Sequence, residues 1–184
     1  PHRSYRDIDA LIAKSTLPDR AKQVALTIFK NIGEVEAKIH GTTLEAIHFH
    51  EVGGVDSIVD ICGAALALHL LGWPEVFTTP PPLGSGTIRI AHGTVPIPVP
   101  ATMELLKDRP VKFEGRGELT TPTGAAILKT LATFAQPPEL IIERIGYGVG
   151  TKDWPDRANV VRASIGRRTS DTTSTLTLLE CNLD

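Results

Sequence analysis

The chain has 184 residues, of which 41% are hydrophobic and 22% charged, and its formal net charge at pH 7 is −2. A chain of this length can bury roughly 70% of its unfolded surface, which is enough for a core without disulfides or structural metals. The weakly negative charge argues against a nucleic-acid partner or an anionic membrane surface, and the longest apolar run, residues 61–71, is too short to span a bilayer.

Two helices are expected at the start of the chain. Residues 4–14 place apolar side chains on one side of a short helix. In residues 18–40, apolar residues recur at intervals of three and four, proline and aspartate suit the first turn, and Gly41 suits the end. We interpret both helices as scaffold.

The next stretch places two histidines beside a glutamate. His48 and His50 are two residues apart, so on an extended segment both side chains point to the same face. Glu51 follows directly, and the glycines at positions 53 and 54 allow a sharp turn into the next segment.

The helix expected over residues 55–71 is apolar nearly all round, and Asp56 and Asp60 lie four apart on one face of it. Such a helix is normally buried, and a buried carboxylate needs a partner, so we expect Asp60 to bind a cation. Imidazole and carboxylate groups on a strand end and the following helix are suitable ligands for a divalent metal. The predicted ligands are His48, His50, Glu51, Asp56 and Asp60. Alternatively, Asp56 only stabilises the helix start, and the histidines are ordinary half-buried residues.

Short strands and loops follow this helix. A strand is expected at residues 75–79, a proline- and glycine-rich loop at 80–86, and a strand at 87–91 that runs into His92. Prolines keep the next segment extended until Pro100 begins a short helix. In the loop, Gly84, Ser85 and Gly86 offer backbone N–H groups to an anion, although these glycines can equally serve only to form the turn.

A second candidate for anion binding begins at Thr121. Thr121 is a good N-cap, Pro122 suits the first helical position, and the small residues 124–126 leave room for a ligand. A helix N-terminus carries unpaired N–H groups and a partial positive charge, which suit a phosphate. A well-capped structural helix explains the same residues equally well.

Residues 140–144 and 160–164 predict two strands, joined by the glycine-rich residues 146–153. These glycines do not form the dinucleotide fingerprint, because their spacing differs and no helix follows. Lys152 and Arg162 are the candidate contacts for an anion; the alternative is that both are solvated surface charges.

Helices and strands interleave without a regular βαβ repeat, which indicates an α+β fold of mixed layered α/β type. We expect one main domain over residues 1–166, a polar linker at 167–174 and the start of a further module at 175–184. The chain begins with Pro1 rather than Met, so we expect a piece of a longer protein. Its two cysteines match no metal or redox spacing, which favours a reducing compartment.

Several motifs, in this order, resemble the LarC nickel-insertion proteins. They are His48-Phe49-His50-Glu51-Val52-Gly53 with Asp56-Ser57-Ile58-Val59-Asp60, then Pro82-Leu83-Gly84-Ser85-Gly86, His92-Gly93, and Leu119-Thr120-Thr121-Pro122-Thr123-Gly124-Ala125-Ala126. Residues 180–184 resemble the opening of that family's C-terminal module. Family members also carry an N-terminal segment before the position of Pro1.

The resemblance implies a cytoplasmic cyclometallase that inserts Ni²⁺ into pyridinium-3,5-bisthiocarboxylic acid mononucleotide, consuming CTP with Mn²⁺ or Mg²⁺. The product is the nickel pincer cofactor of lactate racemase and related enzymes. The implied partners are the mononucleotide, the protein's own C-terminal CTP-binding module, the apo lactate racemase and, in a homo-oligomer, a second copy of the chain.

In this interpretation the five predicted ligands bind nickel, and Glu51 or His50 acts as the base. The mononucleotide is expected to contact Gly84, Ser85, Gly86, His92, Thr121, Thr123, Gly124 and Lys152. Two other functions use the same residues: a metal-dependent nucleotide phosphohydrolase with a metal-bound water, and a non-catalytic nickel-delivery module.

Overall fold

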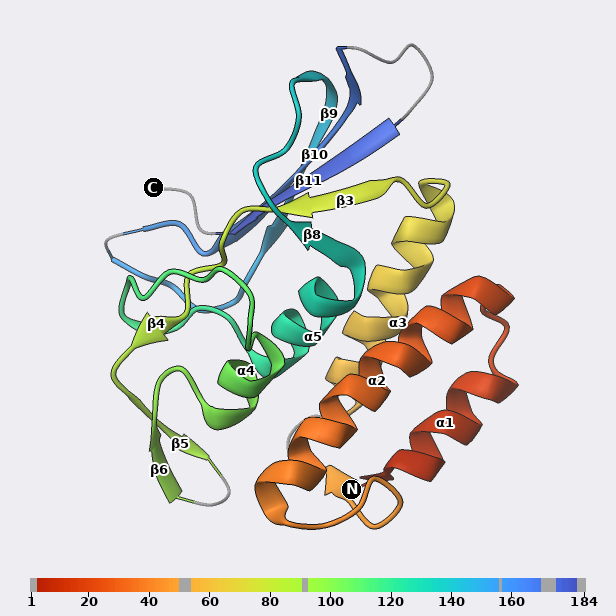
Figure 1. The fold of residues 1–184 in the computed structure, drawn as a ribbon, viewed down its shortest axis with the longest axis vertical. Coiled ribbons are helices and arrows are strands. Elements are labelled where there is room, and N and C mark those ends of the chain that lie inside the picture. Colours follow the sequence, from red (N-terminus) through yellow and green to blue (C-terminus); the bar gives the residue numbers. More distant parts are fainter. Residues whose placement is uncertain (1–2, 50–53, 91–92, 156, 170–174, 182–184) are drawn as a thin grey trace.

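The computed structural model describes residues 3–49, 54–90, 93–155, 157–169 and 175–181. Figure 1 shows the helices gathered on one side of a twisted sheet, with small two-stranded ribbons at one flank. Helices and strands are mixed along the chain, and the α+β class expected from the sequence is confirmed.

The first two helices form where local signals predict them. α1 (Tyr5–Lys14) is capped by Ser4, whose hydroxyl accepts from the Asp7 amide while the Asp7 carboxylate accepts from the Ser4 amide. α2 (Asp19–His40) ends at Gly41, whose φ of +62° is a left-handed conformation that glycine adopts without steric cost. The fully buried residues of both helices form the centre of the core: Ile8, Ile12, Ala21, Ala25, Ile28, Phe29 and Ile32.

The third helix, α3 (Val55–Leu70), is buried on only one side, which corrects the expectation of a helix enclosed all round. It packs on α2 and on α5 (Pro122–Leu131). Its buried residues are Ser57, Ile58, Ile61 and Ala65. Its other side faces solvent, and Val55 and Val59 there are each 61% exposed. No helix in the described ranges is long and apolar enough to cross a membrane.

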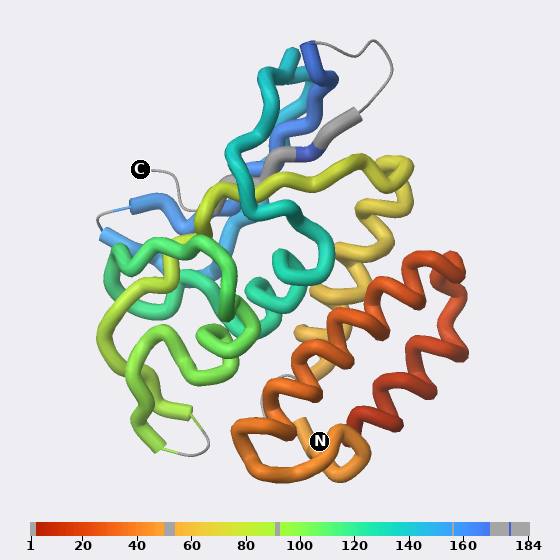
Figure 2. The backbone as a smooth tube through the Cα atoms, viewed as in Figure 1, coloured from red at the N-terminus to blue at the C-terminus, as the bar shows by residue number. Residues whose placement is uncertain are grey.

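Five strands form the main sheet in the order β8–β3–β11–β10–β9. β3 (Glu75–Thr78) lies parallel to β8 (Ala132–Phe134) and to β11 (Thr175–Cys181). β9 (Leu140–Val149), β10 (Val160–Arg168) and β11 form an antiparallel set. β11 runs alongside β3, the yellow-green strand in Figure 2, so the end of the described chain pairs with a strand from its middle.

The two longest strands extend further than the sequence suggests. β9 continues through Gly146 and Gly148, which were expected in a loop, because both residues pair with β10. β10 continues to Arg168, so the polar stretch expected as a linker from Arg167 begins inside a strand. The strand that starts at Thr175 lies between β10 and β3 in this sheet; where a further module begins stays a prediction.

Three two-stranded ribbons and one short helix complete the described fold. The ribbons are β1 (Arg3–Ser4) with β2 (His48–Phe49), β4 (Gly84–Ser85) with β7 (Gly117–Glu118), and β5 (Thr87–Ile90) with β6 (Gly93–Pro96). α4 (Pro100–Leu105) begins at a proline, as predicted, and packs against α2 and α5.

Candidate functional site

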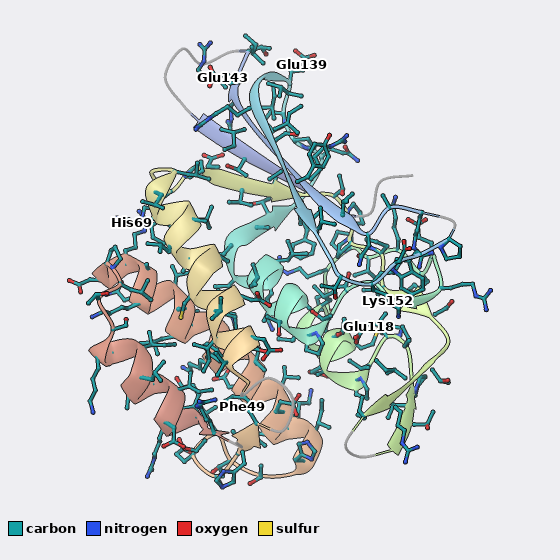
Figure 3. The ribbon with its side chains drawn as sticks, turned by 180° about the vertical axis from the view of Figure 1, so that it is seen from behind. Phe49, His69, Glu118, Glu139, Glu143 and Lys152 are labelled. Carbon is teal, nitrogen blue, oxygen red and sulfur yellow. The ribbon has the colours of Figure 1, made fainter. Side chains whose placement is uncertain are left out.

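The described part of the predicted metal-binding stretch is anchored by Phe49, which Figure 3 shows among the N-terminal helices. The Phe49 side chain is 2% exposed, and its ring centroid lies 6.4 Å from that of Phe29 on α2. The ring also lies beside Gly33 of α2, where a Cβ would be 3.4 Å from Phe49 Cζ, an ordinary contact distance; the missing side chain makes room chiefly for Leu44, whose Cδ1 would lie 2.5 Å away. Successive strand residues point to opposite faces, so the burial of Phe49 leaves His48 exposed.

His48 lies beside the start of α1, since β2 pairs it with Ser4. Hydrogen bonds from the Ser4 hydroxyl and amide, at 2.7 and 2.9 Å, hold the pKa of the Asp7 carboxyl below its usual value, and the nearby His48 adds to this effect. Sequence analysis did not select Asp7 as a neighbour of His48. The capping-box spacing of Ser4 and Asp7 was visible, but the pairing that brings His48 there is not local.

Asp56 and Asp60 lie on the outward side of α3, one turn apart as predicted. Asp56 is in the first turn, where a carboxylate interacts favourably with the helix dipole. The expectation that Asp60 is buried and therefore needs a partner is wrong, because the side of α3 that carries it is exposed. An exposed carboxylate is hydrated, so burial no longer argues for a metal at this position.

Two of the five predicted ligands, His50 and Glu51, lie outside the described residues. Within the described ranges, no group of three or more His, Cys, Asp or Glu side chains converges closely enough to hold a metal ion. His48, Asp56 and Asp60 alone therefore do not form a site. The metal site stays a prediction that depends on His50 and Glu51.

The predicted anion loop forms one strand of the tight ribbon β4–β7. Gly84 has a φ of +84°, and a Cβ there would lie 1.8 Å from the carbonyl oxygen of Gly117. The close approach of the two strands thus requires this glycine, which supports its structural explanation. Ser85 donates its hydroxyl hydrogen to the carbonyl of Gly115 at 2.7 Å. Gly86 has a φ of +106° and open space where a Cβ would be.

Two buried threonines join the segments that carry the family motifs. The Thr120 hydroxyl donates to the carbonyl of Pro82 at 2.6 Å, and the Thr102 hydroxyl on α4 donates to the carbonyl of Thr120 at 3.4 Å. Both side chains are buried, so water does not compete for these hydrogen bonds. The proline-glycine loop, the start of α4 and the start of α5 therefore meet. His92, also predicted in the substrate site, lies outside the described residues.

The start of α5 has fewer open N–H groups than expected. Thr121 caps the helix, as predicted, by accepting from the Gly124 amide at 3.2 Å. Pro122 has no N–H, and the Ala125 amide donates to the carbonyl of Thr121, so Thr123 carries the remaining amide of the first turn. Ala125 is fully buried and serves the core rather than a ligand. At Gly124 there is room, because a Cβ would meet only Thr121 Oγ1, at 3.5 Å.

Figure 3 labels Lys152 near Glu118 of β7, in the ribbon β4–β7. Its Nζ lies 4.1 Å from the ring centroid of Trp154, and the Cζ of Arg157 lies 4.3 Å from the same centroid. The Trp154 ring packs on Gly117 of β7, where a Cβ would lie 2.2 Å from Trp154 Cη2. Sequence analysis missed Trp154 and Arg157, although a tryptophan in a polar loop beside a predicted anion contact is a signal.

A separate groove of about 520 Å³ runs along the exposed side of α4. Its volume is in the range of small-molecule sites. It is lined by Leu83, Pro100, Met103, Glu104, Leu106, Lys107, Asp108, Arg109 and Val111. Leu83 directly precedes the ribbon glycine Gly84, so the groove and the ribbon flank the same loop. Of its lining residues only Leu83 belongs to a motif, the one at residues 82–86.

Comparison with known proteins shows which family this chain belongs to. The family described as nickel insertion protein matches residues 1–184. The chain belongs to this family, which confirms the resemblance found in its motifs.

Three relatives show how much of a protein the chain represents. A putative nickel insertion protein of Myxococcus xanthus is 64% identical, across 100% of this chain and 47% of the relative. Proteins named pyridinium-3,5-bisthiocarboxylic acid mononucleotide nickel insertion protein in Staphylococcus saprophyticus and Geobacillus kaustophilus are 50% and 48% identical, each across 100% of this chain and 47% of the relative. The chain thus spans about half the length of these relatives. No solved structure matches the chain.

Proposed function

We propose that this chain is the part of a nickel-insertion enzyme that brings Ni²⁺ and a pyridinium mononucleotide together. Membership of the nickel insertion protein family supports the reaction. The observation that carries the proposal is the meeting of two motif segments, residues 82–86 and 119–126, through the hydrogen bond from Thr120 to Pro82. Thr102 of α4 adds a hydrogen bond to the carbonyl of Thr120. This places the start of α5 beside the ribbon β4–β7 and gives an extended ligand a surface made from several segments.

In this proposal Ni²⁺ is a substrate that binds transiently to His48, His50, Glu51, Asp56 and Asp60. Imidazole and carboxylate ligands suit an ion that must be passed on, because they hold it less firmly than a set of thiolates. The anchoring of Phe49 supports this role, since it fixes the strand that carries His48. The nearby Asp7 carboxylate adds negative charge at the same edge.

The mononucleotide is proposed to lie against the ribbon and the start of α5, in contact with Gly84, Ser85, Gly86, His92, Thr121, Thr123, Gly124 and Lys152. Bonding of nickel to a ring carbon replaces a carbon–hydrogen bond, so a base must accept the ring proton. Glu51 or His50 is proposed for that step. Space at Gly124 and the remaining amide of Thr123 support close approach of the phosphate.

CTP, with Mn²⁺ or Mg²⁺, is assigned to the C-terminal module of the longer protein, and the nickel pincer cofactor is proposed to serve lactate racemase in the cytoplasm. The 184-residue chain is therefore expected to release no pyrophosphate from CTP. Steady release by the purified chain would move the CTP step into these residues.

Product formation in the purified longer protein tests the proposal. The protein is incubated with the mononucleotide, Ni²⁺, CTP and Mn²⁺, and nickel-bound nucleotide is measured by mass spectrometry. His48→Ala is expected to abolish or strongly reduce the product. The matched control is His69→Ala, which changes a histidine in the last turn of α3 and is expected to keep it. Full product from His48→Ala, or phosphate release in place of nickel insertion, contradicts the proposal.

A further inference from the structure

We propose that the exposed outer strand β9 is the surface on which the remaining part of the longer protein docks. The matched relatives are covered over only 47% of their length, so they contain about as much chain again. This inference goes beyond the proposed function and does not depend on it, because it uses only the architecture of the sheet and the length of the relatives.

β9 is an edge of the main sheet. In the strand order β8–β3–β11–β10–β9 it has a partner on one side only among the described strands. Every residue from Ile141 to Val149 is exposed, so the described chain covers neither face of the strand. Figure 3 labels Glu143 at the end of the sheet that projects away from the helices. A strand of 10 residues that is open on both faces and along one edge is a typical place for another segment to pack.

One face of β9 carries a continuous row of large apolar side chains. Ile145 pairs with Ser164, and Ile142 pairs with Gly166, so Glu143 is an extra residue that forms a β-bulge. Ser164 and Gly166 are two apart on β10 and share a face, so the bulge brings Ile142 onto the same face as Ile145. The members of the row are Ile142, Ile145, Tyr147 and Val149, whose exposed fractions are 55%, 54%, 61% and 77%. Contiguous exposed apolar side chains of this kind mark an interaction surface.

The row points away from the helices. The positions paired at one level across all five strands are Phe134, Thr78, Leu179, Ala163 and Gly146. Phe134 packs against the helical core, so this level marks the face of the sheet that the helices cover. Ile145 and Tyr147 flank Gly146, and successive strand residues point to opposite faces, so both side chains lie on the other face. The described helices therefore leave the row open.

A linked part of the same protein suits this surface better than a second copy of the chain. The bulge at Glu143 interrupts the ladder in the middle of β9, which disfavours edge-to-edge pairing of two β9 strands. A covalently linked segment also needs little contact area, because a short linker raises its effective concentration to roughly the millimolar range. The relatives supply such a segment, since about half of their length lies outside the matched part.

The proposed docking surface ends beside a motif segment. The row finishes at Val149, its most exposed member. Trp154 follows a few residues later and packs on Gly117 of β7, which pairs with Ser85 in the motif at residues 82–86. A module that covers the end of β9 is therefore placed next to that motif.

Hydrogen–deuterium exchange of the purified longer protein tests the docking without any substitution. The amides of residues 141–149 are compared with the same amides in the 184-residue chain. We expect exchange in the longer protein to be slower by roughly tenfold or more, because docking suppresses local opening of the edge strand. The amides of α1 are the internal control and are expected to exchange equally in both proteins. Equal exchange rates at residues 141–149 overturn the proposal.

Lysine substitutions in the longer protein test the row itself. Ile145→Lys combined with Tyr147→Lys places two charges in the proposed interface and is expected to restore fast exchange at residues 141–149, since burying an unpaired charge is unfavourable. The matched control combines Leu70→Lys with Phe113→Lys, at positions that are 76% and 69% exposed elsewhere on the chain. The control is expected to keep the protection. Protection that survives in the Ile145→Lys, Tyr147→Lys variant overturns the proposal.

Dilution and molar mass distinguish the linked part from a second copy. Protection of residues 141–149 by the protein's own remaining part is independent of protein concentration, whereas protection by a second copy falls on dilution. Light scattering is expected to give the same molar mass for the unaltered longer protein and for the Ile145→Lys, Tyr147→Lys variant. A loss of protection on dilution, or a lower molar mass of the variant, assigns the surface to a second copy and overturns the proposal.

Discussion

The Thr120 hydroxyl donates a 2.6 Å hydrogen bond to the carbonyl oxygen of Pro82, inside a contact between two motif segments. Thr120 is 6% exposed, so the carbonyl has no ready replacement partner when the hydroxyl is removed. Thr120→Val keeps the shape of the side chain and is expected to lower the free energy of unfolding by about 1–3 kcal/mol. Urea denaturation measures this loss. Thr133→Val, at an exposed position in β8, is the control and should change stability little.

A second prediction concerns the anchor of the metal-binding stretch. Phe49 is nearly fully buried against Phe29 and Gly33. Phe49→Ala is expected to cost about 3–5 kcal/mol of stability through lost burial and a cavity. It should also weaken Ni²⁺ binding, because the strand that carries His48 loses its attachment to α2. Thermal unfolding and nickel calorimetry measure the two effects.

Phe113→Ala is the matched control for the anchor. Phe113 is 69% exposed, so its removal is expected to change stability by no more than about 0.5 kcal/mol. Phe49→Leu retains most of the apolar volume, so its loss of stability should be smaller than that of Phe49→Ala and larger than that of Phe113→Ala. Unchanged nickel affinity in folded Phe49→Leu and Phe49→Ala would show that the anchor does not position the metal ligands.

The capping box at the start of α1 predicts a pH dependence. The Ser4 hydrogen bonds lower the pKa of the Asp7 carboxyl from its usual 3.8. A carboxyl with a lowered folded-state pKa contributes stability above its unfolded-state pKa, and this contribution is lost as the pH falls through the folded-state value. The stability difference between the unaltered chain and Asp7→Asn is therefore expected to be constant above about pH 5 and to shrink below pH 4.

Ser4→Ala provides the check on the cause of this pH dependence. It removes the hydroxyl that is the largest contributor to the shift in the Asp7 pKa. Urea denaturation from pH 2.5 to 7 should show a weaker fall in stability for Ser4→Ala than for the unaltered chain. An identical acid profile in both proteins would assign the pH dependence to other carboxylates.

Local signals in the sequence predicted the ends of the helices well. Gly41, Pro100 and Thr121 each act through bonds or backbone preferences within a few residues. Ser4 acts in the same local way, but as the cap of α1 rather than as its first residue, which was the expectation. Two of the family motifs, residues 82–86 and 119–126, meet in the structure, and their joint role in one site stays a prediction. The hydrogen bonds of Thr102 and Thr120 now supply the physical reason why those segments lie together.

The errors arose where structure depends on contacts distant in sequence. The exposure of Asp60 follows from which neighbours α3 packs against, and an apolar sequence does not contain that information. Gly146 and Gly148 lie in a strand because β10 pairs with them, although glycine disfavours strands. Trp154 packs on Gly117, a residue far from it in the chain, so the sequence did not indicate this contact.

The final prediction concerns the start of α5. A Cβ at Gly124 has space in the folded chain, since its only near neighbour is Thr121 Oγ1 at 3.5 Å. Gly124→Val should therefore fold, yet its added methyl groups occupy the space through which a phosphate would approach the Thr123 amide. We expect a much weaker affinity for nicotinamide mononucleotide and an unchanged affinity for Ni²⁺, both measured by calorimetry. Gly63→Val, at an exposed α3 position with open space, controls for valine in a helix. Equal mononucleotide affinity in the two variants would mean that Thr121 and Pro122 only cap a structural helix and that the phosphate binds elsewhere.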